Sequence, residues 1–210
     1  MKNLLGSVAL ALTLSGAASA ATIVNGSFES NSGVSGSFRT LLAGNTTGLT
    51  GWTVGGSGAG GGVDLIKTYW AASNGAFSLD MNALNTGSIA QTITNLIVGR
   101  TYVLSFDLAG NPDLPGTRSL GVTVGDESGT YSFNTTGHTK TNMGWSGQTF
   151  SFTAGSGSEL LTFASLNRFA WGPALDNVSV ALAPVPLPAG AVLMVGALGA
   201  LGVARRKRKA

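Results

Sequence analysis

The chain has 210 residues, with 32 glycines, one histidine, no cysteine and only 10% charged residues. The absence of cysteine excludes disulfides and a Cys–His pair, and a single histidine excludes a His-rich zinc site. The formal net charge of +3 arises at the C-terminus, because residues 21–185 hold six cations and all nine acids, a net charge of −3. Such a domain offers no basic surface for nucleic acid.

Residues 1–20 have the pattern of a signal peptide. Lys2 is the only charge before a mostly apolar run over residues 4–14, and Ala18-Ser19-Ala20 supplies the small side chains of a cleavage site. We therefore expect export, with the mature chain beginning at Ala21. Residues 21–183 then form one domain, which is large enough to bury a core without disulfides.

This domain shows the two-residue alternation of β-strands and no helical periodicity. The clearest strand is 100–108, in which Tyr102, Leu104, Phe106 and Leu108 share one face. Further strands are predicted at 22–25, 38–42, 52–54, 63–67, 77–82, 89–94, 119–124, 130–133, 148–153, 159–165 and 175–182. Short strands separated by Gly, Asn and Ser turns predict an all-β fold, a jelly-roll β-sandwich.

Several short motifs follow one another along the domain. They are NGSFE at 25–29, GWTV at 51–54, VDLI at 63–66, SLDMN at 78–82, QTI at 91–93, FDLAGNP at 106–112 and GPALDNVSV at 172–180. In this order they resemble the choice-of-anchor C family, which is related to the DUF642 domains. They are also similar to the galactose-binding-like jelly rolls found among carbohydrate-binding modules. The resemblance covers most of residues 22–182.

The same resemblance implies a structural calcium ion. In such jelly rolls the first and last strands are neighbours, and one acid from each motif, here Glu29 and Asp176, helps to hold Ca²⁺. The ion prefers six to eight oxygen ligands, some of them backbone carbonyls. The alternative is that Glu29 is a turn residue and that Asp176 is an exposed or capping group.

Aromatic side chains are the candidates for sugar binding. Tyr69, Trp70, Trp145 and Trp171 each combine an apolar face, suited to stacking on a sugar ring, with a polar edge. Core packing is the alternative, and it is favoured for Trp52. If residues 69 and 70 are extended, their side chains point to opposite faces, so that one of the two is exposed.

No catalytic residues are predicted. His138 stands in a Thr/Gly/Asn-rich loop, and the chain has no Gly-x-Ser-x-Gly nucleophile turn in a strand–turn–helix setting. Asp107 and Asp113 would be a carboxylate pair for glycoside hydrolysis only by their proximity in sequence. We therefore expect a protein that is not an enzyme.

The C-terminal residues 184–210 read as a membrane-sorting signal. Prolines at 184, 186 and 188 exclude a helix there, and residues 187–204 are 18 residues without charge. Five cations then follow: Arg205, Arg206, Lys207, Arg208 and Lys209. An apolar run stopped by cations predicts one short transmembrane helix at 187–204, with the basic tail 205–209 in the cytoplasm.

The proline motif resembles a known class of bacterial sorting tails. Val185, Pro186, Leu187, Pro188 and Ala189 match the VPLPA variant of the PEP-CTERM class letter for letter. The resemblance implies processing by an exosortase in a Gram-negative bacterium, with transient anchoring in the inner membrane before release or display at the surface. An ordinary C-terminal membrane anchor is the alternative.

Together these features favour an exported, non-catalytic protein of the cell surface or biofilm matrix that binds an exopolysaccharide. A structural surface protein without a glycan site is the first alternative. A glycan-active hydrolase is the second, and two close carboxylates in a cleft would favour it.

Overall fold

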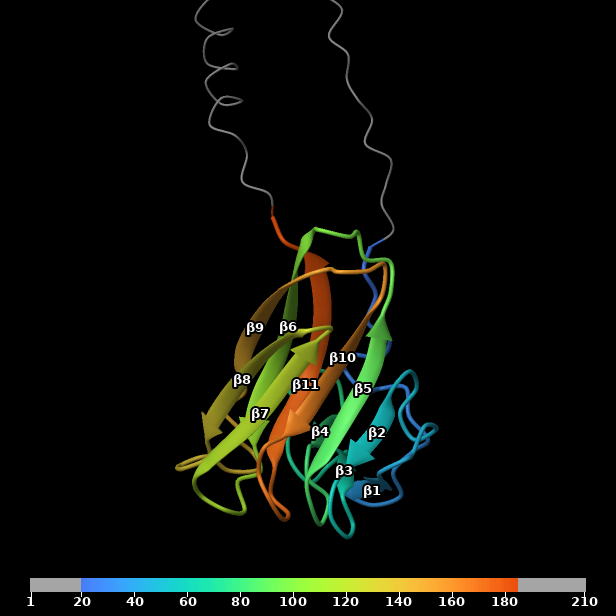
Figure 1. Cartoon of the computed structure of the whole chain (residues 1–210). Helices are drawn as coiled ribbons and strands as arrows, with labels where there is room; N and C mark the ends of the chain where they lie inside the picture. Colours follow the sequence, from blue (N-terminus) through green and yellow to red (C-terminus); the bar gives the residue numbers. More distant parts are fainter. Residues whose placement is uncertain (1–19, 185–210) are drawn as a thin grey trace, which may run out of the picture.

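The computed structural model describes residues 20–184, and every regular element in that part of the chain is a β-strand (Figure 1). The eleven strands are β1 Phe38–Leu42, β2 Thr53–Gly56, β3 Gly62–Ile66, β4 Ser78–Asp80, β5 Gly87–Ile93, β6 Thr101–Gly110, β7 Thr117–Val124, β8 Glu127–Asn134, β9 Ser146–Thr153, β10 Glu159–Ser165 and β11 Pro173–Leu182.

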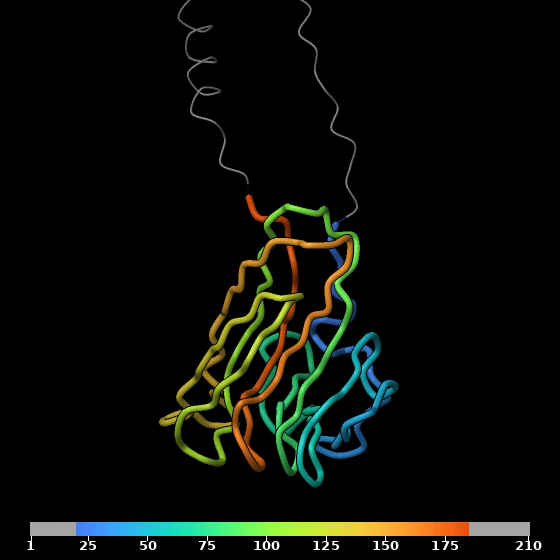
Figure 2. The backbone as a smooth tube through the Cα atoms, in the orientation of Figure 1, coloured from blue at the N-terminus to red at the C-terminus, as the bar shows by residue number. Residues whose placement is uncertain are grey.

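The strands form two antiparallel sheets that face each other as a sandwich (Figures 1 and 2). One sheet has six strands in the order β1-β3-β4-β11-β6-β9, and the other has five in the order β2-β5-β10-β7-β8. Alternating side chains point between the sheets, as the sequence predicted for β6, whose Tyr102, Leu104, Phe106 and Leu108 are all buried. The all-β sandwich expected from the alternation is therefore confirmed.

Eleven of the twelve predicted strands are present, several with the predicted ends. The exception is 22–25, where the structure has only an isolated bridge from Thr22 to Thr94. Asn25 has a φ of 55°, a left-handed conformation that ends an extended segment, and its side chain instead bonds the backbone of Ser30 and Thr50. The NGSFE motif is thus a turn and not part of a strand.

The first and last motifs lie side by side, as the resemblance implied. The backbone N–H of Val178 donates to the carbonyl of Gly26 at 2.9 Å. A Cβ on Gly26 would lie 1.9 Å from the Val178 carbonyl oxygen, so only glycine fits here. The chain therefore closes on itself through a backbone contact between its two ends.

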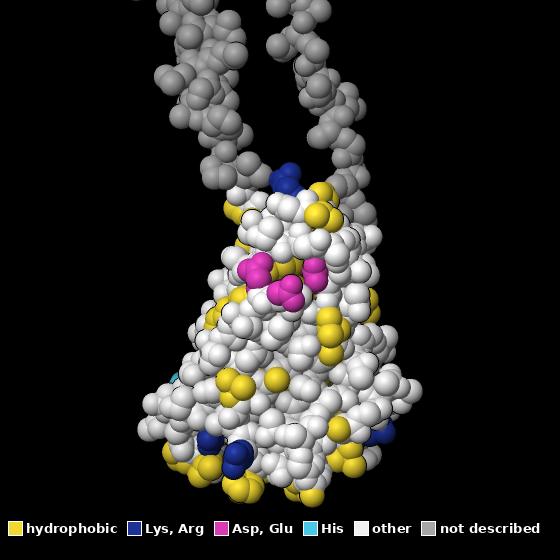
Figure 3. Space-filling model, in the orientation of Figure 1, with side chains coloured by type: hydrophobic (Ala, Val, Ile, Leu, Met, Phe, Trp, Pro, Cys, Tyr) yellow, Lys and Arg dark blue, Asp and Glu magenta, His cyan; other side chains and the backbone are white. Residues whose placement is uncertain are grey.

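The two ends of the sandwich differ. Residues 20 and 184, where the described chain begins and ends, lie at one end, and the loops after β4, β6 and β10 lie at the other (Figures 1 and 2). These loops carry much of the exposed apolar surface, which gathers at that end in Figure 3. Its members there are Leu84, Leu114, Leu166, Phe169 and Trp171.

No helix within residues 20–184 is long and apolar enough to cross a bilayer. The predicted signal peptide 1–20, apart from residue 20, and the predicted transmembrane helix 187–204 lie outside the described residues. The same holds for the proline motif 185–189 and the basic tail 205–209.

Candidate functional site

A pocket of about 390 Å³ opens on the outer face of the six-stranded sheet, at the loop end of the sandwich. Residues at every second position of β1 and β3 form its floor, and the alternate residues Leu41, Val63 and Leu65 point into the core. The loops after β4, β6 and β10 form its walls. The lining residues are Phe38, Thr40, Leu42, Asp64, Ile66, Tyr69, Asp80, Asn82, Ala83, Leu84, Asn111, Ala170 and Trp171.

Strand register brings three polar residues into one row across the floor. Thr40 pairs with Asp64, and Asp64 pairs with Asp80, across β1, β3 and β4. The Thr40 hydroxyl donates to Asp64 Oδ1 at 2.6 Å. Two carboxylates directly opposite each other on neighbouring strands repel when both are ionised.

Asp80 is the buried member of this pair, with 2% of its surface exposed. Its Oδ1 accepts from the backbone N–H of Asn82 and of Gly172, and its Oδ2 accepts from Asn111 Nδ2 at 2.8 Å. Burial, with a smaller contribution from the nearby Asp64, raises the pKa of Asp80 to about 7, although the three hydrogen bonds act to lower it. Burial also raises the pKa of Asp64.

Asn82 connects the floor to the β10–β11 loop. Its Nδ2 donates to the carbonyl of Asn167 at 3.0 Å and to that of Phe169. Its Oδ1 is buried and has no hydrogen-bond partner among the described residues. A Cβ on Gly172 would lie 2.5 Å from this oxygen and 2.7 Å from Asp80 Oδ1, so glycine is required at that position.

The β10–β11 loop holds its aromatic residues in a strained backbone. Phe169 and Trp171 have φ values of 64° and 63°, a left-handed conformation that costs a bulky residue on the order of 1–3 kcal/mol. Trp171 remains 42% exposed and lines the pocket. Strain of this kind concentrates at binding sites, where neighbouring contacts hold it in place.

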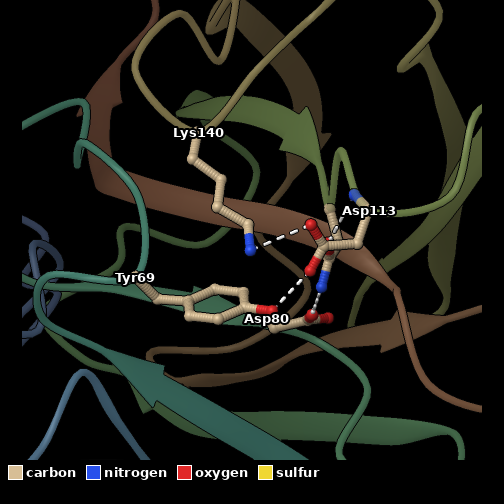
Figure 4. Close-up of polar contacts among 5 residues, drawn as sticks. Tyr69, Asp80, Asp113 and Lys140 are labelled. Carbon is tan, nitrogen blue, oxygen red and sulfur yellow. Dashed lines mark hydrogen bonds and ion pairs between the residues drawn. The ribbon is translucent and has the colours of Figure 1, made fainter.

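Tyr69 contributes the second aromatic wall and is fixed by charged neighbours. Its hydroxyl donates to Asp113 Oδ2, and Lys140 Nζ lies 3.7 Å from its ring centroid and 2.9 Å from Asp113 Oδ1 (Figure 4). Partial burial raises the pKa of Asp113, but its bonds to Tyr69 and Lys140 outweigh this and lower it. Phe38, at 5.4 Å between ring centroids, packs edge-on against Tyr69.

The aromatic candidates therefore divide into pocket and core. Tyr69 and Trp171 line the pocket, together with Phe38, which the sequence reading did not select. Trp70 is only 3% exposed and donates its Nε1 to Ser78 Oγ, so a stacking role for it was wrong. Trp145 is partly buried, donates to the carbonyl of Ala71 and is not a lining residue.

Glu29 and Asp176 lie away from this pocket and hold the segment 73–77. Glu29 Oε1 accepts from the backbone N–H of Ala76 and Phe77, at 2.8 and 2.9 Å. Asp176 is fully buried, and its Oδ2 accepts from the N–H of Ser73 and of Asn74, both at 2.8 Å. We call these two carboxylates and this segment the carboxylate clip.

Calcium binding by the clip stays a prediction. Asp176 Oδ1 also accepts from the N–H of Asn177, so N–H donors occupy both of its oxygens. Within residues 20–184 no group of three or more His, Cys, Asp or Glu side chains is placed to hold a metal. The hydrogen bonds of the clip hold the segment 73–77 to the ends of the domain.

Asp107 and Asp113, the candidate pair for hydrolysis, bind different partners and do not act together. Asp107 accepts from Ser73 Oγ at 2.6 Å and from Asn177 Nδ2, whereas Asp113 bonds Tyr69 and Lys140. His138 packs its ring 5.0 Å from that of Phe133. These contacts give each side chain a role in packing or in holding a loop.

The residues that sequence reasoning missed stand inside the motifs it used. Asp64 is in VDLI, Asp80 and Asn82 are in SLDMN, and Asn111 is in FDLAGNP. Each of these motifs combines core residues with a polar residue that faces the pocket. For Asp64 the available signal was a polar residue at an outward position of an otherwise apolar strand, whereas Asn82 and Asn111 lie in the loops after β4 and β6.

Comparison with known proteins identifies relatives of this chain. The family described as "Protein of unknown function (DUF642)" matches residues 21–181. Halomucin of Haloquadratum walsbyi is 33% identical over 174 residues, which are 80% of this chain. The matched region is 2% of halomucin, so the comparison concerns one small part of that protein.

Among solved structures, three carbohydrate-binding modules are similar in shape. TmCBM61 in complex with β-1,4-galactotriose is 17% identical, with 64% of this chain and 90% of that one covered and a TM-score of 0.47. CBM35 of Paenibacillus barcinonensis is 21% identical, with 70% of this chain and 100% of that one covered and a TM-score of 0.45. A family 35 module of Clostridium thermocellum is 16% identical, with 69% of this chain and 98% of that one covered and a TM-score of 0.46. All three TM-scores lie below 0.5, so the sandwich assignment rests on the chain's own strand pairing.

Proposed function

The chain belongs to the DUF642 family, and we propose that it is an exported, non-catalytic module that binds a glycan. The observation that carries the proposal is the pocket, in which Phe38, Tyr69 and Trp171 stand around a floor of hydrogen-bond acceptors. A pyranose ring has an apolar C–H face and a rim of hydroxyls, and this pairing of surfaces suits both. The volume is within the usual range of about 300–1,000 Å³ for ligand sites.

The position of the pocket supports a role at a surface. The loops after β4, β6 and β10, which line it, lie at the end of the sandwich opposite residues 20 and 184 (Figure 1). A module tethered through either terminus would therefore present the pocket away from its attachment point. We propose accordingly that the fold is a galactose-binding-like jelly roll displayed towards an extracellular polysaccharide.

A substitution in the pocket wall tests this function. Trp171→Ala removes an exposed ring and is expected to weaken binding to the host's exopolysaccharide roughly tenfold, with little change in stability. The scale is that of a base stacked on one aromatic ring in nucleic-acid sites, which contributes about 1–3 kcal/mol. Phe169→Ala is the matched control: it is in the same loop, is 68% exposed and does not line the pocket. Equal binding by both variants and the unmodified protein would refute a site here.

Two observations favour the hydrolase alternative. Asp64 and Asp80 are two carboxylates in one pocket, and the pKa of Asp80 is raised to about 7. Against it, Asp80 is buried and holds three hydrogen-bond donors, one from each of the loops after β4, β6 and β10. A general acid must reach the glycosidic oxygen, and Asp80 is held away from it by these bonds. Release of new reducing ends from a bound glycan would revive the alternative.

We also propose that residues 184–210 act as a sorting signal of the VPLPA type. The proline motif, the uncharged run and the terminal cations support an exosortase partner and a transient stay in the inner membrane. The intact mass of the protein recovered from the outside of the host cells should then lack the basic tail. Recovery of the tail on the surface form would favour a permanent anchor.

A further inference from the structure

The floor of the pocket presents hydrogen-bond acceptors in excess of donors. Asp64 lies in the row between Thr40 and Asp80, and the Thr40 hydroxyl proton is already given to Asp64. Asn82 is 1% exposed, lines the pocket and has its Oδ1 without a partner among the described residues. A buried acceptor without a donor costs about 1–3 kcal/mol, so this part of the floor is short of donors as well.

The pocket also lacks a positive charge of its own. None of its lining residues in the described chain is a lysine or an arginine, although two of them are aspartates. Lys140 pairs with Asp113, and Arg118, whose charge interacts with Asp80, donates to the carbonyls of Leu114 and Thr117. Asp64 stands opposite a second carboxylate with no cation among the lining residues, and this favours a ligand that brings a positive charge.

Aromatic rings stand around the same acceptors. Phe38, Tyr69 and Trp171 line the pocket together with Asp64 and Asp80. Ring faces attract a cation within about 6 Å of the centroid, and desolvation strengthens this attraction. Aromatic rings combined with carboxylates are the surroundings that bind an ammonium group, which has three donors and no acceptor.

We propose that the pocket selects a glycan with free, protonated amino groups, such as a polymer of 2-amino-2-deoxyhexose. The inference rests on the proposed glycan-binding function and names the class of sugar. The ammonium group donates to Asp64, while the aromatic rings contact the C–H face of the sugar. N-acetylation removes both the charge and two of the three donors, and a uronic acid places a third carboxylate beside Asp64 and Asp80.

Three hexasaccharides test this selection by isothermal titration with the purified protein. They are the β-1,4-linked hexamers of glucosamine, of N-acetylglucosamine and of glucose, which differ only at carbon 2. The glucosamine hexamer is expected to bind at least tenfold more tightly than the other two. Asp64→Asn keeps the acceptor for Thr40 and should reduce this preference to less than threefold.

A charge-matched control separates the pocket from general attraction between a polycation and an acidic protein. Asp126→Asn makes the same charge change in the exposed β7–β8 turn and should leave the affinity for the glucosamine hexamer within twofold. An equal loss in both variants, or no loss in Asp64→Asn, would overturn the inference.

The outcomes also distinguish failure of the selection for amino groups from failure of the proposed glycan binding. Suppose that an uncharged hexamer binds as tightly as the glucosamine hexamer, or more tightly, and loses this binding in Trp171→Ala. That result would overturn the selection for amino groups and still support the glycan site. Failure of all three hexamers, together with failure of the host's exopolysaccharide, would overturn both. Binding of the glucosamine hexamer that is lost in Trp171→Ala and in Asp64→Asn, but kept in Asp126→Asn, would support both the glycan site and its selection for amino groups.

Discussion

Asp80 and Asp176 are two buried carboxylates with similar surroundings, but one lines a pocket and the other holds a loop. Asp80 and Asp176 each accept three N–H bonds, and burial raises the pKa of each, to about 7 and about 6. Asp176 belongs to the carboxylate clip and is covered by the segment it holds. Asp80 lines the open pocket beside Asp64. The comparison teaches that burial and hydrogen bonding alone do not distinguish a structural acid from one at a binding site.

The largest expected effect is the pH dependence that Asp80 gives to folding. Its pKa is near 7 in the folded protein and 3.8 ordinarily, so the folded state binds the proton more tightly. The free energy of unfolding therefore falls as pH rises from about 4 to about 7, by at most about 4 kcal/mol at 1.36 kcal/mol per pKa unit. An asparagine side chain stays neutral, so the free energy of unfolding of the Asp80→Asn variant should not show this decrease between about pH 4 and about pH 7.

Urea denaturation at pH 4, 5.5 and 7 measures this effect as the difference between the unmodified protein and the variant. Other titrating groups, including Asp176, are present in both and cancel. Parallel stability profiles for the two proteins would show that folding does not raise the pKa of Asp80.

Removal of the acid in the clip has the next largest effect. Asp176→Ala leaves the N–H groups of Ser73, Asn74 and Asn177 without their acceptor, and at about 1 kcal/mol for each bond this lowers the free energy of unfolding by about 3 kcal/mol. Chemical denaturation in the presence of a chelator measures it, with Asp126→Ala as an exposed control. A loss no larger than that of the control would contradict the structural role of the clip.

The calcium prediction adds a smaller effect to the same comparison. If Glu29 and Asp176 hold Ca²⁺, millimolar calcium raises the Tm of the unmodified protein by several degrees and leaves that of Asp176→Ala unchanged. A Tm of the unmodified protein that does not respond to calcium would leave hydrogen bonding as the whole role of the clip.

The sequence predicted the strands well because their alternation is set by the core. The ends of β1 and β10 agree with the prediction, and the inward side chains of β6 and β9 were identified correctly. The segment 22–25 failed because Asn25 adopts a left-handed backbone, which alternation of residue types does not reveal. Local pattern predicts a strand but not the residue at which a turn interrupts it.

The site was less predictable because it depends on register between distant strands. Thr40, Asp64 and Asp80 meet only through the order β1-β3-β4, and Asn82 reaches the pocket wall through Asn167 and Phe169, more than eighty residues away. Trp171 and Tyr69 were found from residue type alone. Trp70, with the same chemistry, is buried in a cluster with Ile66, Ala109 and Met143, which meet it only through the tertiary fold.

The most direct test of the glycan site is the response of the tryptophan indole signals in ¹⁵N-resolved NMR. Titration with the glucosamine hexamer should shift the indole N–H signal of Trp171. The signals of Trp52 and Trp70, which donate within the protein to the carbonyl of Asn25 and to Ser78 Oγ, should stay in place. A response confined to Trp171 would place the glycan in this pocket. A bound glycan that leaves the Trp171 signal unmoved would contradict the account.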